Sequence, residues 1–228
     1  MPAQLLIFDL DGTLVDSAPD IVEAVNALMR ERGRSTIDKQ IITAAIGEGL
    51  HSLMQSVFPE VRSDAKALTV FEHDFQRHYG QHLVDKTVVF PGVENFLAKW
   101  PGQLAIVTNK NIAFARQVVT GLGLDRFPWS SISGADSFAR KKPDPFPLQE
   151  AMRVAGVTPH ETLMIGDGIP DMVAARRAGV HSIAIDLGYA SPASLRAAGA
   201  SLAISSYSEL PATIARAHAL PARMPSQE

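Results

Sequence analysis

Short apolar runs recur along the chain, and each is bounded by polar or glycine residues. The runs are LLIF at 5–8, LAIV at 104–107, SSIS at 130–133, LMI at 163–165, SIAI at 182–185 and LAIS at 202–205. Continuous apolar runs of this length are typical of strands that are buried on both faces. The pattern therefore predicts a sheet covered on both sides.

Helical patterns separate these runs. They cover residues 93–100, 111–123, 147–156 and 171–179. Asn111 is suited to the N-cap position, and the second pattern ends at a glycine. Thr158, Pro159 and Glu161 form a further helix start, but the next strand follows so closely that we expect a single turn. Strands and helices that alternate in this way predict a doubly wound parallel α/β sheet.

The alternation breaks between about Asp16 and Asp85, where several amphipathic helices are expected and no strand. The predicted helix starts are Ser17 with Asp20 and then Ser35 or Thr36, and the predicted breaks are Gly33, Gly47, Gly49 and Gly80. We therefore predict an inserted all-helical cap domain at residues 16–85 and a core formed by residues 1–15 and 86–228. Because the insertion follows the first strand, it emerges at the carboxyl end of the sheet and is suited to act as a lid.

Acidic residues follow the first strand in the sequence DLDGT. Alternate residues of an extended strand share a face, so Asp9 and Asp11 could point the same way while Gly12 turns the chain. Two like charges at close range raise each other's pKa unless a cation intervenes. A simple strand-end turn is the alternative interpretation. Asp16 lies further along and is expected at the junction with the cap.

A second acidic group, in MIGDGIPD, follows another predicted strand. Asp171 could begin the next helix as an acidic cap, which would be a purely structural role. If Asp167 and Asp171 share one sheet edge with Asp9 and Asp11, four carboxylates converge and repel one another without a metal. Oxygen ligands with no nearby cysteine or paired histidine point to Mg²⁺.

Two polar features follow the remaining strands. Thr108, Asn109 and Lys110 come directly after LAIV, and Lys142 lies in the proline-stiffened segment ARKKPDP. A hydroxyl, backbone amides and a lysine are suitable donors for phosphate oxygens. Taken singly, each feature could equally be an ordinary turn or a solvated basic loop.

The order of the four features resembles the haloacid dehalogenase superfamily of phosphohydrolases. That superfamily carries DxDGT, a Thr or Ser after the second core strand, a Lys commonly in KPxP, and GDxxxD. This chain has DLDGT, VTNK, KKPDP and GDGIPD in the same order. The resemblance covers essentially the whole chain and is greatest to the phosphoglycolate phosphatase and beta-phosphoglucomutase branch. It implies a Rossmann-like core with a helical cap and the activity of a phosphoric monoester hydrolase.

The resemblance also implies roles for the residues after the first strand. Asp9 matches the nucleophile that takes the phosphoryl group as an aspartyl-phosphate. Asp11 matches the residue that protonates the leaving alcohol and then deprotonates the attacking water. The dehalogenases of the superfamily lack an acid at this position, because halide leaves without a proton. The sequence therefore resembles the phosphoryl-transfer enzymes.

Further roles follow from the other motifs. The implied magnesium ligands are the carboxylates of Asp9 and Asp167, the backbone carbonyl of Asp11, and Asp171 either directly or through water. The implied phosphoryl-binding groups are Thr108, the amide of Asn109, and Lys142. These groups would offset the charge on the transferring phosphoryl oxygens.

Substrate choice is expected to depend on the cap, where IGEGL at residues 46–50 is the recognisable motif. Gly47, Glu48 and Gly49 could face the substrate, since related phosphoglycolate phosphatases carry a similar segment, or could form an ordinary turn between helices. The expected substrate is a small phosphorylated metabolite, with 2-phosphoglycolate leading. The alternatives are a beta-phosphoglucomutase-like sugar phosphomutase, whose Arg- and Lys-bearing cap pattern is not recognised here, and a nonenzymatic phospho-acceptor module similar to receiver domains.

The composition of the chain excludes several classes of partner and of metal site. The net charge is −3 and aromatics make up 7%, so no basic stripe for nucleic acid or an anionic membrane is present. With no cysteine, a disulfide framework and a thiolate metal site are excluded. No apolar stretch reaches the length of a membrane helix and no signal peptide is recognisable, so we expect a cytoplasmic protein, a monomer or small homo-oligomer. His78 and His82 are expected on a surface helix rather than in a metal site.

Overall fold

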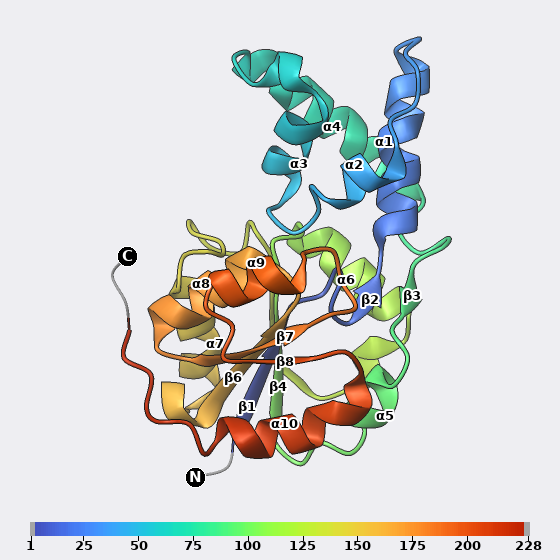
Figure 1. Cartoon of the computed structure of the whole chain (residues 1–228). Helices are drawn as coiled ribbons and strands as arrows, with labels where there is room; N and C mark the ends of the chain where they lie inside the picture. Colours follow the sequence, from blue (N-terminus) through green and yellow to red (C-terminus); the bar gives the residue numbers. More distant parts are fainter. Residues whose placement is uncertain (1–2, 226–228) are drawn as a thin grey trace.

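The centre of the molecule is a parallel sheet of six strands in the computed structural model, which describes residues 3–225 (Figure 1). The strands run in the order β5-β4-β1-β6-β7-β8, and every neighbouring pair is parallel. Their bounds are Leu5–Phe8 for β1, Gln103–Val107 for β4, Trp129–Ser133 for β5, Thr162–Gly166 for β6, His181–Ile185 for β7 and Leu202–Ile204 for β8. All six strands predicted from the apolar runs are confirmed.

Helices cover both faces of the sheet. They are α5 (Val93–Leu97), α6 (Ile112–Gly121), α7 (Phe146–Ala155), α8 (Ile169–Ala178), α9 (Pro192–Ala197) and α10 (Leu210–Ala217), with short 3₁₀ turns at Leu124–Arg126, Pro159–Glu161 and Tyr207–Glu209. The run that forms β1 is apolar throughout because both faces of this strand are buried. Leu6 and Phe8 join a core with residues of α5, α6 and α10, whereas Leu5 and Ile7 join a second core with α7 and α8. The predicted doubly wound α/β architecture is confirmed.

The predicted core helices are present with shifted boundaries, and α5 ends at Leu97 rather than Trp100. Asn111 caps α6, since its side chain accepts a hydrogen bond from the amide of Ala113. Thr158 and Glu161 form the expected capping box around a single turn. Asp171 does not begin α8, because the helix already starts at Ile169 and the Asp171 side chain reaches back to the amide of Gly168. Helices α9 and α10 were not among the predicted elements.

The inserted segment holds four α-helices, which Figure 1 shows gathered at one end of the sheet. They are α1 (Ala18–Glu31), α2 (Lys39–Thr43), α3 (Leu50–Val57) and α4 (Ala65–Gln81), with a 3₁₀ turn at Pro59–Val61. We call this group the cap. Its two connections to the core pair as a short antiparallel ribbon of β2 (Val15–Asp16) and β3 (Val88–Val89). The prediction of no strand from Asp16 onward is therefore wrong at its first residue. The domain boundaries at 15/16 and 85/86 stay a prediction.

Two local predictions in the cap are wrong. Neither Ser35 nor Thr36 starts the second helix, because Asp38 takes the N-cap position and accepts from the amide of Gln40 at 2.7 Å. Gly80 does not break a helix but lies inside α4, where a Cβ atom would stand 3.3 Å from the ring of Phe114. The glycine permits close packing of α4 against the core.

The ribbon of β2 and β3, which we call the hinge ribbon, is held by the buried Asp20 and the half-buried Asp16. Asp20 of α1 is 1% exposed and accepts hydrogen bonds from the backbone amides of Lys86 and Thr87 and from the Thr87 hydroxyl. Asp16 accepts from the hydroxyl of Tyr189 at 3.1 Å, which ties the ribbon to the loop after β7. The expected position of Asp16 at the cap junction is confirmed.

The structure also bears on the expectations for His78 and His82 and for membrane-spanning helices. His78 pairs with Glu31 and His82 with Asp85, and neither histidine joins a metal-ligating cluster within residues 3–225. Among the described helices, none has the length and apolar character needed to cross a bilayer.

Candidate active site

The loop after β1 carries Asp9 to the carboxyl edge of the sheet. Asp9 is 3% exposed, and its Oδ1 accepts from the amide of Leu10 at 2.7 Å. Gly12 turns the chain with φ of +77°, and a Cβ atom at this position would lie 2.1 Å from Oδ2 of Asp167. Only glycine fits both the backbone conformation and this approach, so the turn brings the first acidic motif against the second.

Three carboxylates meet at this edge. One oxygen each of Asp9, Asp167 and Asp171 lies within 4.8 Å of the others, and all three residues are buried. Asp167 is oriented by the hydroxyl of Thr13 at 2.7 Å and the amide of Tyr189 at 3.0 Å. The predicted acidic cluster is therefore brought together, except that the carboxylate of Asp11 does not join it.

Lys142 is the buried counter-ion of this cluster. Its side chain is 1% exposed, and its Nζ lies 3.0 Å from Oδ1 of Asp9 and 2.6 Å from Oδ1 of Asp171. It also donates to the carbonyl of Val107 at 2.5 Å. Burial opposes the charge of Lys142, but Asp171 and Asp9 outweigh that effect and raise its pKa. The two carboxylates therefore favour the charged form of Lys142.

The charge balance shows that the cluster fits a divalent cation. Burial, followed by the charge of Asp171, raises the pKa of Asp9 to about 7. Burial and the charge of Asp9 also raise the pKa of Asp167 well above its usual value. With all three carboxylates ionised, the single ammonium of Lys142 leaves two negative charges uncompensated in a buried place. Carboxylate oxygens with this excess charge are a suitable donor set for Mg²⁺.

Asp11 has a separate partner, which the sequence did not predict. Lys110 Nζ donates to both carboxylate oxygens of Asp11, at 2.9 and 3.1 Å, and to the hydroxyl of Tyr79 on α4 at 2.6 Å. Ser17 also donates to Asp11, at 2.6 Å. The predicted start of α1 at Ser17 is confirmed, but the hydroxyl binds Asp11 and does not cap the helix. Lys110 belongs to the VTNK motif that the sequence analysis singled out. The spacing of the motifs gave no sign that Tyr79 of the cap would bind it.

Thr108 and Asn109 lie where the sequence predicted, at the end of β4. Both are 4% exposed. The hydroxyl of Thr108 accepts from the amide of Lys110 at 3.2 Å, which shapes a tight turn after the strand. The Asn109 side chain donates to the carbonyl of Lys142 at 3.0 Å and to that of Gly47 in the cap at 3.1 Å.

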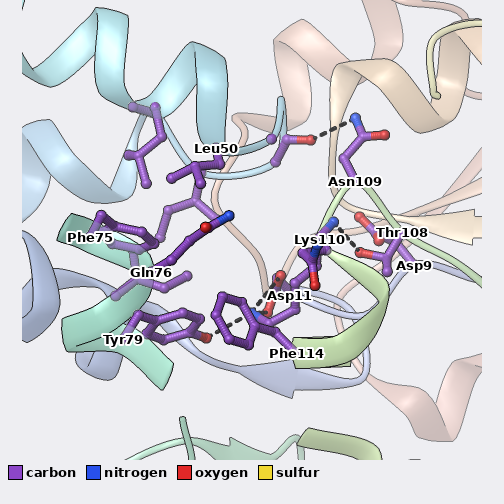
Figure 2. Close-up of a pocket in the computed structure, with 17 residues that line it drawn as sticks. Asp9, Asp11, Leu50, Phe75, Gln76, Tyr79, Thr108, Asn109, Lys110 and Phe114 are labelled. Atoms are coloured by element: carbon purple, nitrogen blue, oxygen red, sulfur yellow. Dashed lines mark hydrogen bonds and ion pairs between the residues drawn. The ribbon is translucent and has the colours of Figure 1, made fainter. Parts of the chain in front are cut away.

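A cavity of about 70 Å³ lies between these groups and the cap (Figure 2). Asp9, Asp11 and Thr108 lie on its core side. Of the predicted cap residues, Gly47 and Gly49 line it, but Glu48 does not. The Glu48 side chain is exposed, and its carbonyl accepts from Lys141 at 2.8 Å.

This arrangement agrees with comparison to known proteins. The model of a family described as Haloacid dehalogenase-like hydrolase matches residues 6–185. The chain belongs to this family. The match begins inside β1 and ends with β7, so it includes both acidic motifs and the cap. As a member of the haloacid dehalogenase-like hydrolases, the chain is an enzyme that hydrolyses phosphoric monoesters, and the predicted resemblance is confirmed.

Relatives within the family carry a common name. A phosphoglycolate phosphatase of Chromobacterium violaceum is 37% identical over 89% of this chain and 92% of its own. A plasmid phosphoglycolate phosphatase of Cupriavidus necator is 36% identical over 97% of both chains. The crystal structure of a predicted phosphoglycolate phosphatase from Haemophilus somnus 129pt superimposes with a TM-score of 0.84 at 25% identity, over 92% of this chain and 97% of that one.

Proposed function

We propose that this hydrolase is a magnesium-dependent phosphatase that cleaves 2-phosphoglycolate through an aspartyl-phosphate on Asp9. The observation that carries the proposal is the position of Asp9. It lies between a buried ammonium and two further carboxylates and lines a small cavity under the cap. The substrate is suggested by the relatives named phosphoglycolate phosphatase.

In the first step, a carboxylate oxygen of Asp9 attacks phosphorus and the bond between phosphorus and the ester oxygen breaks. Leu10 and Lys142 hold Oδ1 of Asp9, so the orientation of the carboxylate is fixed before attack. For this step Asp11 must carry a proton on an oxygen that is free of Lys110. It gives that proton to the leaving oxygen, and glycolate departs as the free alcohol.

In the second step, water attacks phosphorus of the aspartyl-phosphate. Asp11, now ionised, accepts a proton from this water, and the bond between phosphorus and the Asp9 oxygen breaks. Inorganic phosphate leaves and Asp9 is again a carboxylate. Lys110 and Ser17 hold the Asp11 side chain in place through both steps.

The charge on the phosphoryl oxygens is offset by groups around Asp9. Thr108 and the amide of Asn109 would donate to these oxygens, and Lys142 supplies fixed positive charge behind the nucleophile. A magnesium ion bound by the three clustered carboxylates and the backbone carbonyl of Asp11 would supply further positive charge when present.

The size of the cavity favours a small substrate. A single water needs about 10–15 Å³ of such space. The cavity of about 70 Å³ therefore suits a phosphate ester with only a few further atoms better than a hexose phosphate. This disfavours the sugar phosphomutase, and membership of a hydrolase family disfavours the nonenzymatic acceptor.

The proposal is tested by phosphate release across 2-phosphoglycolate, hexose phosphates, nucleotides, phosphoserine and pyrophosphate, with Mg²⁺ and with EDTA. We expect 2-phosphoglycolate to give the highest kcat/KM and EDTA to remove turnover. Asp9→Asn should abolish turnover and leave the fold intact by circular dichroism, because the amide is not a nucleophile.

Asp125→Asn is the matched control, because Asp125 is exposed and lies outside the cavity. It should keep the wild-type rate. Undiminished turnover by Asp9→Asn would contradict the assigned nucleophile. A hexose phosphate as preferred substrate, with little free phosphate released, would favour the phosphomutase.

A further inference from the structure

Lys110 is the one cationic side chain among the described residues that line the cavity. Lys142 is the other lysine paired with the acidic residues, but its Nζ binds Asp9 and Asp171 and it does not line the cavity. The side chain of Lys110 is 5% exposed, and its Nζ forms an ion pair with Oδ1 of Asp11 at 2.9 Å. A substrate entering the cavity therefore meets positive charge at Lys110.

The Lys110 ammonium has a donor left for a ligand. It carries three N–H bonds. Figure 2 shows Nζ bonded to Asp11 and to the hydroxyl of Tyr79. Because the two oxygens of one carboxylate lie in nearly the same direction, a single N–H can serve both oxygens of Asp11. The ring of Tyr79 also lies 4.6 Å from the Nζ atom. These contacts fix the position of the ammonium and leave its third N–H without a partner among the described residues.

A second free donor comes from the cap. Gln76 lies three residues before Tyr79 on α4, so both side chains project from the same side of the helix. Figure 2 shows the amide end of Gln76 directed into the cavity. Within residues 3–225 this amide forms no hydrogen bond with the protein. It is therefore available to a bound molecule.

Apart from the polar groups of the core side, which include Asp11, the wall near these donors is apolar. The apolar part is formed by Ile21, Leu50, Leu53, Phe75 and Phe114. An apolar wall lowers the local dielectric constant, so a few placed donors dominate the choice of ligand. An ammonium and a primary amide that converge on such a space suit a carboxylate.

The two ends of the site lie close together. The Nζ of Lys110 lies 2.9 Å from Oδ1 of Asp11, and Asp11 lines the cavity together with Asp9 and Thr108. A molecule whose phosphoryl group reaches Thr108 and Asp9 therefore needs only a short carbon chain to place a second anionic group at Lys110.

We propose that Lys110 and Gln76, with Tyr79 as a positioning residue, form a carboxylate subsite that selects short phosphate esters bearing an acid group. The inference rests on the proposed function and names the residues that would make the enzyme specific for such esters. Ethyl phosphate provides the matched probe, because it has the two-carbon chain of 2-phosphoglycolate without the carboxylate.

The test measures kcat/KM of wild type, Lys110→Met, Lys110→Arg and Gln76→Leu for 2-phosphoglycolate and ethyl phosphate. The wild type should prefer 2-phosphoglycolate. In Lys110→Met this preference should fall by roughly 10- to 100-fold, as expected when a charged hydrogen bond is lost. Gln76→Leu should lower it less, and Lys110→Arg should restore part of it because the charge is kept.

Lys141→Met is the control, because Lys141 is a neighbouring lysine that binds Glu48 and does not line the cavity. It should leave the preference between the two esters unchanged. The ratio of kcat/KM for 2-phosphoglycolate to kcat/KM for ethyl phosphate reports binding of the carboxylate. A disturbed Asp11 would slow the reaction of both esters, so it would not lower the ratio in the same way.

An equal loss for both esters in Lys110→Met, with the preference kept, would overturn the subsite while the proposed function stands. A wild type that releases no phosphate from 2-phosphoglycolate would instead overturn the proposed function. If Lys110→Met fails to fold by circular dichroism, Gln76→Leu and Lys110→Arg decide the question by the same ratio.

Discussion

At the scale of single residues, two buried lysines divide the acidic side chains of the site between them. Lys142 pairs with Asp9 and Asp171, whereas Lys110 pairs with Asp11. The proposed nucleophile and the proposed acid–base residue therefore have separate counter-ions. Since only Lys110 lines the cavity, only that lysine is available to the substrate's second group.

Replacing Lys142 with Met should destabilise the protein strongly in the absence of Mg²⁺. Removal of one partner leaves Asp9 and Asp171 buried without compensation, and such losses cost about 3–5 kcal/mol of unfolding free energy. Added Mg²⁺ should restore part of this stability, because it supplies the missing positive charge. Urea denaturation of both proteins, with and without Mg²⁺, measures the effect.

The matched variant is Lys99→Met, since Lys99 is exposed. It should change the unfolding free energy by less than about 0.5 kcal/mol. If Lys142→Met unfolds at the same urea concentration as wild type in EDTA, the lysine is not the counter-ion that holds the cluster.

At the scale of elements, the cap meets the core in two places besides the contacts of α4 with Lys110 and Phe114. The hinge ribbon is secured by Asp20, which binds the amides of Lys86 and Thr87. Opposite the hinge, the loop before α3 meets the core, where Asn109 donates to the carbonyl of Gly47 and Lys141 to that of Glu48. The second contact closes the cavity over Asp9, so the loop's fit against the core should influence turnover.

Gly49→Ala should reduce kcat/KM more than Gly47→Ala does. Both glycines have positive φ, so both substitutions carry backbone strain. A Cβ atom at Gly49 would lie 3.2 Å from the backbone carbonyl of Asn109 and 2.7 Å from Nζ of Lys141, the movable end of its side chain. One at Gly47 meets nothing within 4 Å. The difference between the two variants therefore reports the close approach of the loop to the core. We expect roughly a tenfold difference, a modest shift in the barrier of about 1.4 kcal/mol.

Steady-state kinetics with 2-phosphoglycolate measures this difference. Circular dichroism melts confirm that both variants are folded. Equal losses in the two variants would show that strain alone, and not docking of the loop on Lys141, controls the rate.

Elements with a repeating or buried pattern could be predicted from the sequence, and elements defined by contacts could not. The run LLIF predicted β1 because both faces of the strand are buried. The ribbon strands have two residues each, too few to show a pattern. Gly80 was interpreted as a break because the ring of Phe114, which it packs against, is distant in the sequence. Tyr79 was missed for the same reason, since its contact with Lys110 joins the cap to the core.

At the scale of the whole molecule, the parallel sheet explains why distant motifs form one site. Asp9 and Asp11 follow β1, Thr108 follows β4, and Asp167 follows β6. These strands are neighbours in the sheet and end at the same edge, so their loops converge. The cap then covers this edge through a hinge that starts within the first loop. This is why the order of the motifs alone was enough to predict the acidic cluster.

The central claim, a phosphoryl group carried on Asp9, is tested most directly by acid quenching during turnover. The enzyme is mixed with 2-phosphoglycolate and Mg²⁺, quenched within the first turnovers, and digested for peptide mass mapping. We predict one added phosphoryl group on Asp9, and none in Asp9→Asn. Steady release of phosphate with no labelled peptide, or a label on another residue, would contradict the account.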